Sequence, residues 1–440
     1  MHRAARWCVA IGMALRLSTL APWARAQEPA AGRAIPARLR LDQALALLRA
    51  QGLDLLIAQA EVRGAEAELR AARGLRNPVL SLSAGRSLGY HPPCSGCSAD
   101  YYSASLADQA LLTDLLAGKR GLRIDAAAAG LEATRMARAD TERILIGAVK
   151  QAYAHVVVAQ TARLFAQETQ LTTQRALDLV QVRYNAGAVS EADVARATTA
   201  VLQADQQLVL ADEALRSTKI ALAFLLGVRG PLPSFEVDPS ALRLEPMPPL
   251  HTIASLLLQA TNARPDLQAA RHQVRRAQSN VALTRRQLFP DLELTVQYTQ
   301  QGTSASAIQP PTLIAGLSAP LPLLYQYQGQ IGRARAELAA RQLGQERVRA
   351  QIAADVQSAF VAFESARNRV QRMRGQLLNS ARKGRDLVMV QYEKGAASLL
   401  EMLDAQRTLI AIHAAYLQDL TDYWTSLFQL EQAIGRELTP

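Results

Sequence analysis

The chain has 440 residues, with 49 Lys and Arg against 38 Asp and Glu, which gives a formal net charge of +11. An excess of this size, spread over many helix faces, indicates solvated surface, so we expect no nucleic-acid partner. No proline occurs in 94–230 or in 323–439, and these runs predict very long helices, for which a compact enzyme has little use. Because no H-E-x-x-H or comparable cluster occurs, we expect no enzyme activity, no cofactor and no metal site.

The first residues resemble a secretory signal. Arg3 and Arg6 precede an apolar stretch, and a small-residue cleavage site ends at Ala26. We therefore expect residues 1–26 to be a signal peptide and residues 27–38 to be a loose lead-in of the exported chain.

Two cysteines remain after the signal peptide, Cys94 and Cys97, in a loop with neighbouring prolines and glycine. A lone C-x-x-C pair is compatible with a redox motif, half a metal site or a loop disulfide. Export to an oxidising compartment favours the loop disulfide.

The remainder reads as two copies of one unit. In each copy the periodicity predicts a helix, two strands joined by a loop, and two long helices joined by a tight turn. The first copy covers 39–229 and the second 252–436, with a proline-rich linker, 230–251, between them. The first helix is expected over 41–76, and the first long helix over 119–186.

The strands alternate apolar and polar side chains over about ten residues, the pattern of transmembrane β-strands. They are expected at about 79–86, 101–112, 291–300 and 312–321. Four strands cannot close a barrel, and an open sheet edge is not viable in lipid. Several chains must therefore share one barrel if the strands span a membrane. Three chains would give twelve strands, but the sequence does not choose three over two or four.

The tight turn between the long helices carries the same residues in both copies. These are Tyr184, Gly187, Ser190 and Asp193 in the first copy, and Tyr392, Gly395, Ser398 and Glu401 in the second. The glycines are expected to supply a positive φ, and the serines to cap the returning helices. A contact with a partner protein at the same turns stays open as a second role.

The chain resembles the TolC-type outer-membrane efflux channels. The resemblance is carried by the repeated turns and by Leu41-Asp42-Gln43-Ala44-Leu45, Arg264-Pro265-Asp266-Leu267 and Phe289-Pro290-Asp291-Leu292. It implies a mainly α protein with a membrane β-barrel portion: a homotrimer whose twelve-stranded barrel in outer-membrane lipid continues as a periplasmic α-helical barrel. It also implies the outer-membrane channel of a tripartite efflux or type I secretion system. Such a channel is a passive conduit, opened at its periplasmic tip by docking of an adaptor (membrane fusion protein) that leads to an inner-membrane pump. The exported substrate is not specified.

The resemblance further implies a gate at the repeated turns. Glu401 and Asp404 would face the pore, where three copies of each would favour cations and repel one another, raising some carboxyl pKa values. Asp193 and Tyr392 would be partners in a contact that holds the tip shut. The first copy has Arg196 where the second has Asp404, so only one turn supplies two acids. A solvated helix surface is the alternative for both acids.

The alternative function is a periplasmic coiled-coil adaptor or structural protein, which would share the long hairpins and the export signal. It does not account for amphipathic strands placed symmetrically in both copies.

Overall fold

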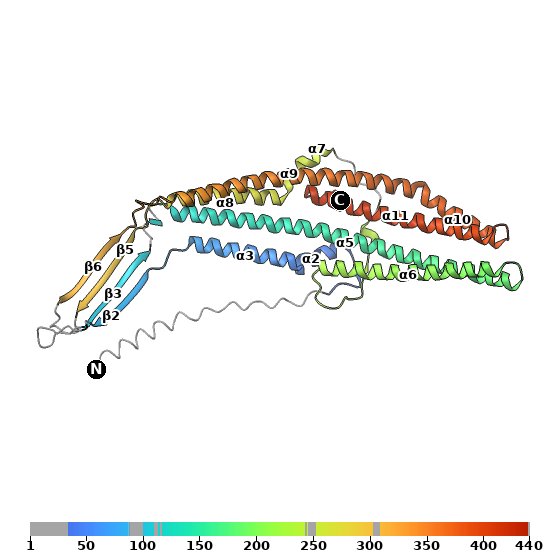
Figure 1. Cartoon of the computed structure of the whole chain (residues 1–440), viewed down its shortest axis with the longest axis horizontal. Helices are drawn as coiled ribbons and strands as arrows, with labels where there is room; N and C mark the ends of the chain where they lie inside the picture. Colours follow the sequence, from blue (N-terminus) through green and yellow to red (C-terminus); the bar gives the residue numbers. More distant parts are fainter. Residues whose placement is uncertain are drawn as a thin grey trace.

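The protein is elongated, with a β-sheet at one end and long helices running to the other (Figure 1). The structure, a computed structural model, describes residues 34–86, 88, 100–109, 113–114, 117–242, 244, 252–301 and 309–438. The predicted signal peptide, Cys94 and Cys97 lie outside these residues.

The first copy contains α2, Leu41–Gln51, α3, Leu53–Arg73, α5, Lys119–Asn185, and α6, Glu191–Leu225. Helix α5 agrees with the long helix predicted over 119–186. The single helix predicted over 41–76 is wrong, because the chain leaves helical geometry at Gly52, where φ is −58° and ψ is 121°. A Cβ there would lie 2.6 Å from the Leu48 carbonyl oxygen, so the break needs glycine.

The second copy repeats this order with α7, Ile253–Ala263, α8, Pro265–Arg286, α9, Gln328–Arg372, α10, Leu378–Glu393, and α11, Leu399–Ile434. Helix α8 starts with proline at its first position, which helices accept because that N–H has no intrahelical partner. A π-helical turn, Met373–Leu377, separates α9 from α10. Within the described residues, no helix combines the length and the apolar character needed to cross a membrane.

In both copies, a glycine that follows the returning helix packs near the start of the same copy. Gly227 follows α6 with a φ of +76°, and a Cβ there would lie 2.2 Å from the Gln51 carbonyl oxygen. Gly435 follows α11 with a φ of +72° and packs against Ala263. In each copy, therefore, the returning helix ends against the break between the two short helices. Close approach and positive φ together require glycine at residue 227.

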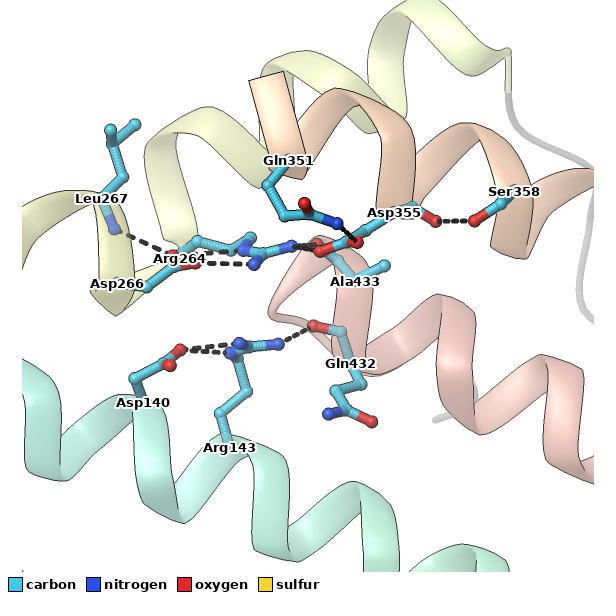
Figure 2. A network of polar contacts seen from close by, with 10 residues as sticks. All are labelled: Asp140, Arg143, Arg264, Asp266, Leu267, Gln351, Asp355, Ser358, Gln432 and Ala433. Carbon is cyan, nitrogen blue, oxygen red and sulfur yellow. Dashed lines mark hydrogen bonds and ion pairs between the residues drawn. The ribbon is translucent and has the colours of Figure 1, made fainter. Parts of the chain in front are cut away.

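Arg264 holds this junction together in the second copy, as Figure 2 shows. The residue is 4% exposed, lies 2.6 Å from Asp266 and 2.9 Å from Asp355, and donates to the Ala433 carbonyl at 3.3 Å. Arg143 from α5 donates to the neighbouring carbonyl of α11. Two arginines thus donate to carbonyls in the last turn of α11, where basic side chains are favourable.

The sheet has the order β2-β3-β5-β6, with antiparallel neighbours throughout. Its strands are β2, Val79–Arg86, β3, Asp100–Gln109, β5, Glu293–Gln301, and β6, Gln309–Ser318. The register puts apolar side chains in rows across one face, such as Leu80, Leu106, Val296 and Ala315. Polar pairs share the other face, where the Ser83 and Ser103 hydroxyls are 2.7 Å apart. The predicted alternation is confirmed.

The observed ends of β6 differ from the predicted 312–321. The strand begins at Gln309 and includes Pro310 and Pro311, which lie at a shift in the register with β5. Prolines are tolerated at such irregularities because the regular ladder is interrupted there. The strand ends before Pro320.

A small parallel pair joins β1, Arg38–Leu39, to β4, Glu236–Val237, where the sequence predicts no regular structure. A 3-10 turn, Pro239–Ala241, follows β4. The Tyr153 hydroxyl of α5 donates to the Asp238 carbonyl at 2.6 Å, and Leu39 and Val237 are buried. These contacts fix the lead-in to the middle of the long helix.

Candidate gate at the helical tip

The end of the molecule farthest from the sheet is formed by the two repeated turns (Figure 1). Gly187 and Gly395 have φ of +73° and +79°, and nothing lies within 4 Å of a Cβ built on either. Both glycines therefore serve backbone conformation rather than close packing. Ser190 and Ser398 are the N-caps of α6 and α11, as predicted.

The acids at the turns belong to two capping boxes. The Ser398 hydroxyl accepts from the Glu401 N–H at 3.2 Å, and the Glu401 carboxylate accepts from the Ser398 N–H at 2.7 Å. Ser190 and Asp193 form the same arrangement at α6. The repeated Ser-x-x-acid spacing is thus a reciprocal cap that satisfies otherwise unpaired backbone N–H groups.

The two acids expected to face a pore lie three residues apart at the start of α11. Both Glu401 and Asp404 are exposed, and Asp404 forms no ion pair within the described part of the chain. Hydrogen bonds from the Ser398 backbone and hydroxyl lower the pKa of Glu401. In one chain this shift is opposite to the one expected from rings of acids, because the cap stabilises the charged carboxylate.

Asp193 and Tyr392 lie near each other without a hydrogen bond between them. Asp193 bonds to Ser190 and pairs with Arg196 at 3.1 Å. The Tyr392 hydroxyl is buried and has no hydrogen-bond partner among the described residues. Burial raises the pKa of Tyr392; the positive charge of Arg183 opposes this rise, and the negative charge of Asp193 adds to it.

Arg183, which the sequence pattern did not single out, joins the two hairpins at the tip. It lies on the last turn of α5 and donates to the Tyr392 carbonyl at 2.7 Å and the Glu393 carbonyl at 3.1 Å. Its guanidinium carbon is 4.5 Å from the centre of the Tyr392 ring. Basic side chains bind helix C-terminal carbonyls and aromatic faces favourably, so Arg183 contributes two hydrogen bonds and one ring contact at the end of α10.

Apolar residues from both hairpins pack beneath this contact. The buried cluster consists of Ala176, Val180, Ala197, Tyr392, Leu399, Met402 and Leu403. Because it draws on α5, α6, α10 and α11, it holds the two turns side by side.

Farther from the tip, a cavity of about 750 Å³ lies between α5, α6 and α11. His413 borders it, 4% exposed and stacked on Phe165 with ring centres 3.6 Å apart. Burial lowers the pKa of His413 to about 4, and the nearby positive charge of Arg382 acts in the same direction. The described residues contain no group of three or more His, Cys, Asp or Glu side chains placed to hold a metal ion.

Both copies of the repeated unit match one family of known proteins. Residues 44–228 and 256–436 match the family described as outer membrane efflux protein. The chain belongs to this family. The match spans both copies, so the alternative of a periplasmic adaptor or structural coiled coil does not hold.

This efflux protein is similar to relatives with named roles. It is 28% identical over 391 residues to the pyoverdine export outer membrane protein OpmQ of Pseudomonas aeruginosa, covering 85% of this chain and 80% of the relative. It is 28% identical over 418 residues to the solvent efflux pump outer membrane protein SrpC of Pseudomonas putida, covering 91% and 85%.

The fold is also that of solved efflux channels. A structure of CusC matches with a TM-score of 0.75 at 21% identity, covering 90% of this chain and 92% of that one. The protein is therefore an outer-membrane efflux channel component with a large periplasmic helical part. Its family members are channels of tripartite efflux systems, which act with adaptor and inner-membrane partners.

Proposed function

We propose that three copies of this chain form one channel, with a twelve-stranded barrel in the outer membrane continued by a helical tunnel in the periplasm. The tunnel is a passive conduit, and the adaptor and inner-membrane pump supply the energy and select the cargo. Docking of the adaptor to the repeated turns opens the tip.

The sheet carries this proposal. Strands β2 and β6 each pair on one side only, so one chain has two sheet edges with unpaired backbone groups. Leu80 on β2 and Leu313 on β6 are 64% and 71% exposed. Lipid suits these side chains but not open edges, and other copies satisfy the edges by adding strands. The TM-score to the CusC structure supports the chain fold on which this assembly depends.

The tip supports the gating part of the proposal. Glu401 and Asp404 from three chains would form negative rings that favour cations. The capping box fixes the start of α11 beside these acids, and Arg183 ties that hairpin to its neighbour. We propose that adaptor binding separates these hairpins by a helix shift, for which the Arg183 contacts to α10 must break.

Extraction and native mass test the assembly. The protein should leave outer-membrane fractions only with detergent, and the extracted species should have the mass of three chains. A soluble periplasmic product, or a stable assembly of two or four chains, would overturn the proposed architecture.

A further inference from the structure

The segment between β6 and α9 lies where the sheet joins the helices (Figure 1), and its apolar side chains are exposed. Leu321, Leu323 and Leu324 are 68%, 77% and 102% exposed, and Tyr325 is 50% exposed. Phe289, which precedes β5, is also exposed. Three leucines in water within four residues are unfavourable unless another surface covers them.

These side chains continue the apolar face of the sheet. Leu317 is on that face, opposite Leu294 of β5, and the exposed segment follows it directly along the chain. If the sheet spans the membrane, as proposed above, this segment lies at the periplasmic boundary of the bilayer. Tyrosine is favourable at such an interface because its ring is apolar and its hydroxyl is polar. Leucine is favourable where its side chain reaches the acyl region.

Arginines without acidic partners surround the same junction. Arg285 and Arg286 are on the last turn of α8, and Arg333 and Arg335 are near the start of α9. All four are exposed, and none forms an ion pair within the described residues. Arg286 lies over the Phe289 ring, 5.6 Å from its centre.

Two acids of the junction, in contrast, are already paired with basic side chains. Asp291 lies 2.7 Å from Lys119, and Asp114 pairs with Arg123. Glu293 at the start of β5 and Asp125 on α5 form no ion pair among the described residues, so the four unpaired arginines leave a net positive charge at the junction. Helices α5 and α9, which start here, have no acid in their first turn, whereas α6 and α11, which start at the tip, have acids there. The positive ends of two helix dipoles thus add to the basic side chains.

We propose that this junction binds the anionic phospholipid headgroups of the periplasmic leaflet. The boundary of the acyl region receives Leu321, Leu323 and Leu324. The headgroup phosphates are bound by four arginines, here called the basic belt: Arg285, Arg286, Arg333 and Arg335. Guanidinium groups bind phosphate oxygens through paired N–H donors, and apolar insertion beside basic residues is the usual form of interfacial binding. The proposal rests on the proposed membrane channel and names the lipid class that it selects.

Lipid selection by the purified assembly tests the belt. Native mass spectrometry would compare bound phosphatidylglycerol with bound phosphatidylcholine after incubation with an equimolar mixture of the two. Wild type should prefer phosphatidylglycerol, and the preference should fall as salt rises. The variant Arg285→Gln/Arg286→Gln/Arg333→Gln/Arg335→Gln should lose it, by roughly fivefold for each arginine that lies near the headgroups.

A matched variant, Arg271→Gln/Arg275→Gln/Arg341→Gln/Arg347→Gln, removes the same charge from the same two helices away from the sheet. It should keep the preference. Two results would overturn the basic belt but not the channel. One is an equal loss of the phosphatidylglycerol preference in both variants, and the other is a wild type that forms channels without any lipid preference. The belt variant should still conduct in phosphatidylcholine bilayers. If wild type forms no channel in either lipid, the proposed function fails instead.

Discussion

Arg183 and Tyr392, from different copies of the repeated unit, make two contacts at the tip. The Arg183 guanidinium donates a hydrogen bond of 2.7 Å to the Tyr392 carbonyl, and its carbon lies 4.5 Å from the centre of the Tyr392 ring. Tyr392 is 2% exposed, so the contact is shielded from water on one side. It is the most direct link between the two hairpins next to the candidate gate.

Removing this link should loosen the tip. Arg183→Ala deletes both the carbonyl hydrogen bonds and the ring contact, so we expect a larger conductance and more frequent opening without adaptor. Single-channel recording measures both quantities. Arg175→Ala, an exposed arginine on the same helix, is the control and should behave as wild type. Equal conductance for Arg183→Ala and Arg175→Ala would contradict a role for Arg183 in closure.

Neutralising the proposed acidic rings should abolish cation preference. Glu401→Gln/Asp404→Asn is the suitable change, because glutamine preserves the capping box that alanine would break. The reversal potential in a salt gradient should move towards zero. Glu191→Gln/Glu393→Gln removes the same charge from exposed tip positions and should leave the reversal potential unchanged. If the two variants shift it equally, a general surface charge rather than a gate sets selectivity.

His413 should make the helical part less stable in mild acid. Its pKa is about 4 in the folded chain against an ordinary 6.5, so the folded state disfavours the protonated ring. The contribution is complete above pH 6.5 and is lost as pH falls towards 4, at a cost of up to about 3 kcal/mol. Thermal unfolding followed by circular dichroism across this range should show the loss.

His413→Phe keeps a ring against Phe165 and removes the titration. Its Tm should therefore fall less than that of wild type between pH 6.5 and 4, whereas His272→Phe should follow wild type. Parallel curves for wild type and His413→Phe would show that carboxylates alone produce the acid sensitivity.

Breaking the Arg264 network should destabilise the second copy (Figure 2). Arg264→Met leaves Asp266, Asp355 and the Ala433 carbonyl without their shared donor. The free energy of unfolding should fall by about 2 kcal/mol, the range for charged hydrogen bonds in partly buried sites. Chemical denaturation measures this. Arg271→Met, an exposed change on the same helix, should cost little, and equal losses would argue against the network.

The sequence predicts the long-range plan well because that plan depends on periodic patterns. The absence of proline predicts a long helix in the region of α5, and strict alternation predicts the row that contains Leu80 and Val296. The cap roles of Ser190 and Ser398 follow from their position before amphipathic helices.

Features that depend on tertiary contact were not predictable in the same way. The break at Gly52 lies where Gly227 approaches the backbone closely, and Arg183 contacts a carbonyl 209 residues away in the sequence. Periodicity also cannot show that Glu401 caps its own helix, since the same acid at that spacing fits a pore-lining role. The capping box gives Glu401 a structural role. Conductance measurements test its role in the proposed gate.

Single-channel conductance of the purified wild-type assembly in planar bilayers tests the central claim most directly. The proposed trimeric channel, closed at its tip by the Arg183 contact and lined there by Glu401 and Asp404, predicts small, cation-selective currents. Insertion without any current selectivity would contradict the acidic tip. No conductance from a sample shown by circular dichroism to be folded and helical would contradict the channel itself.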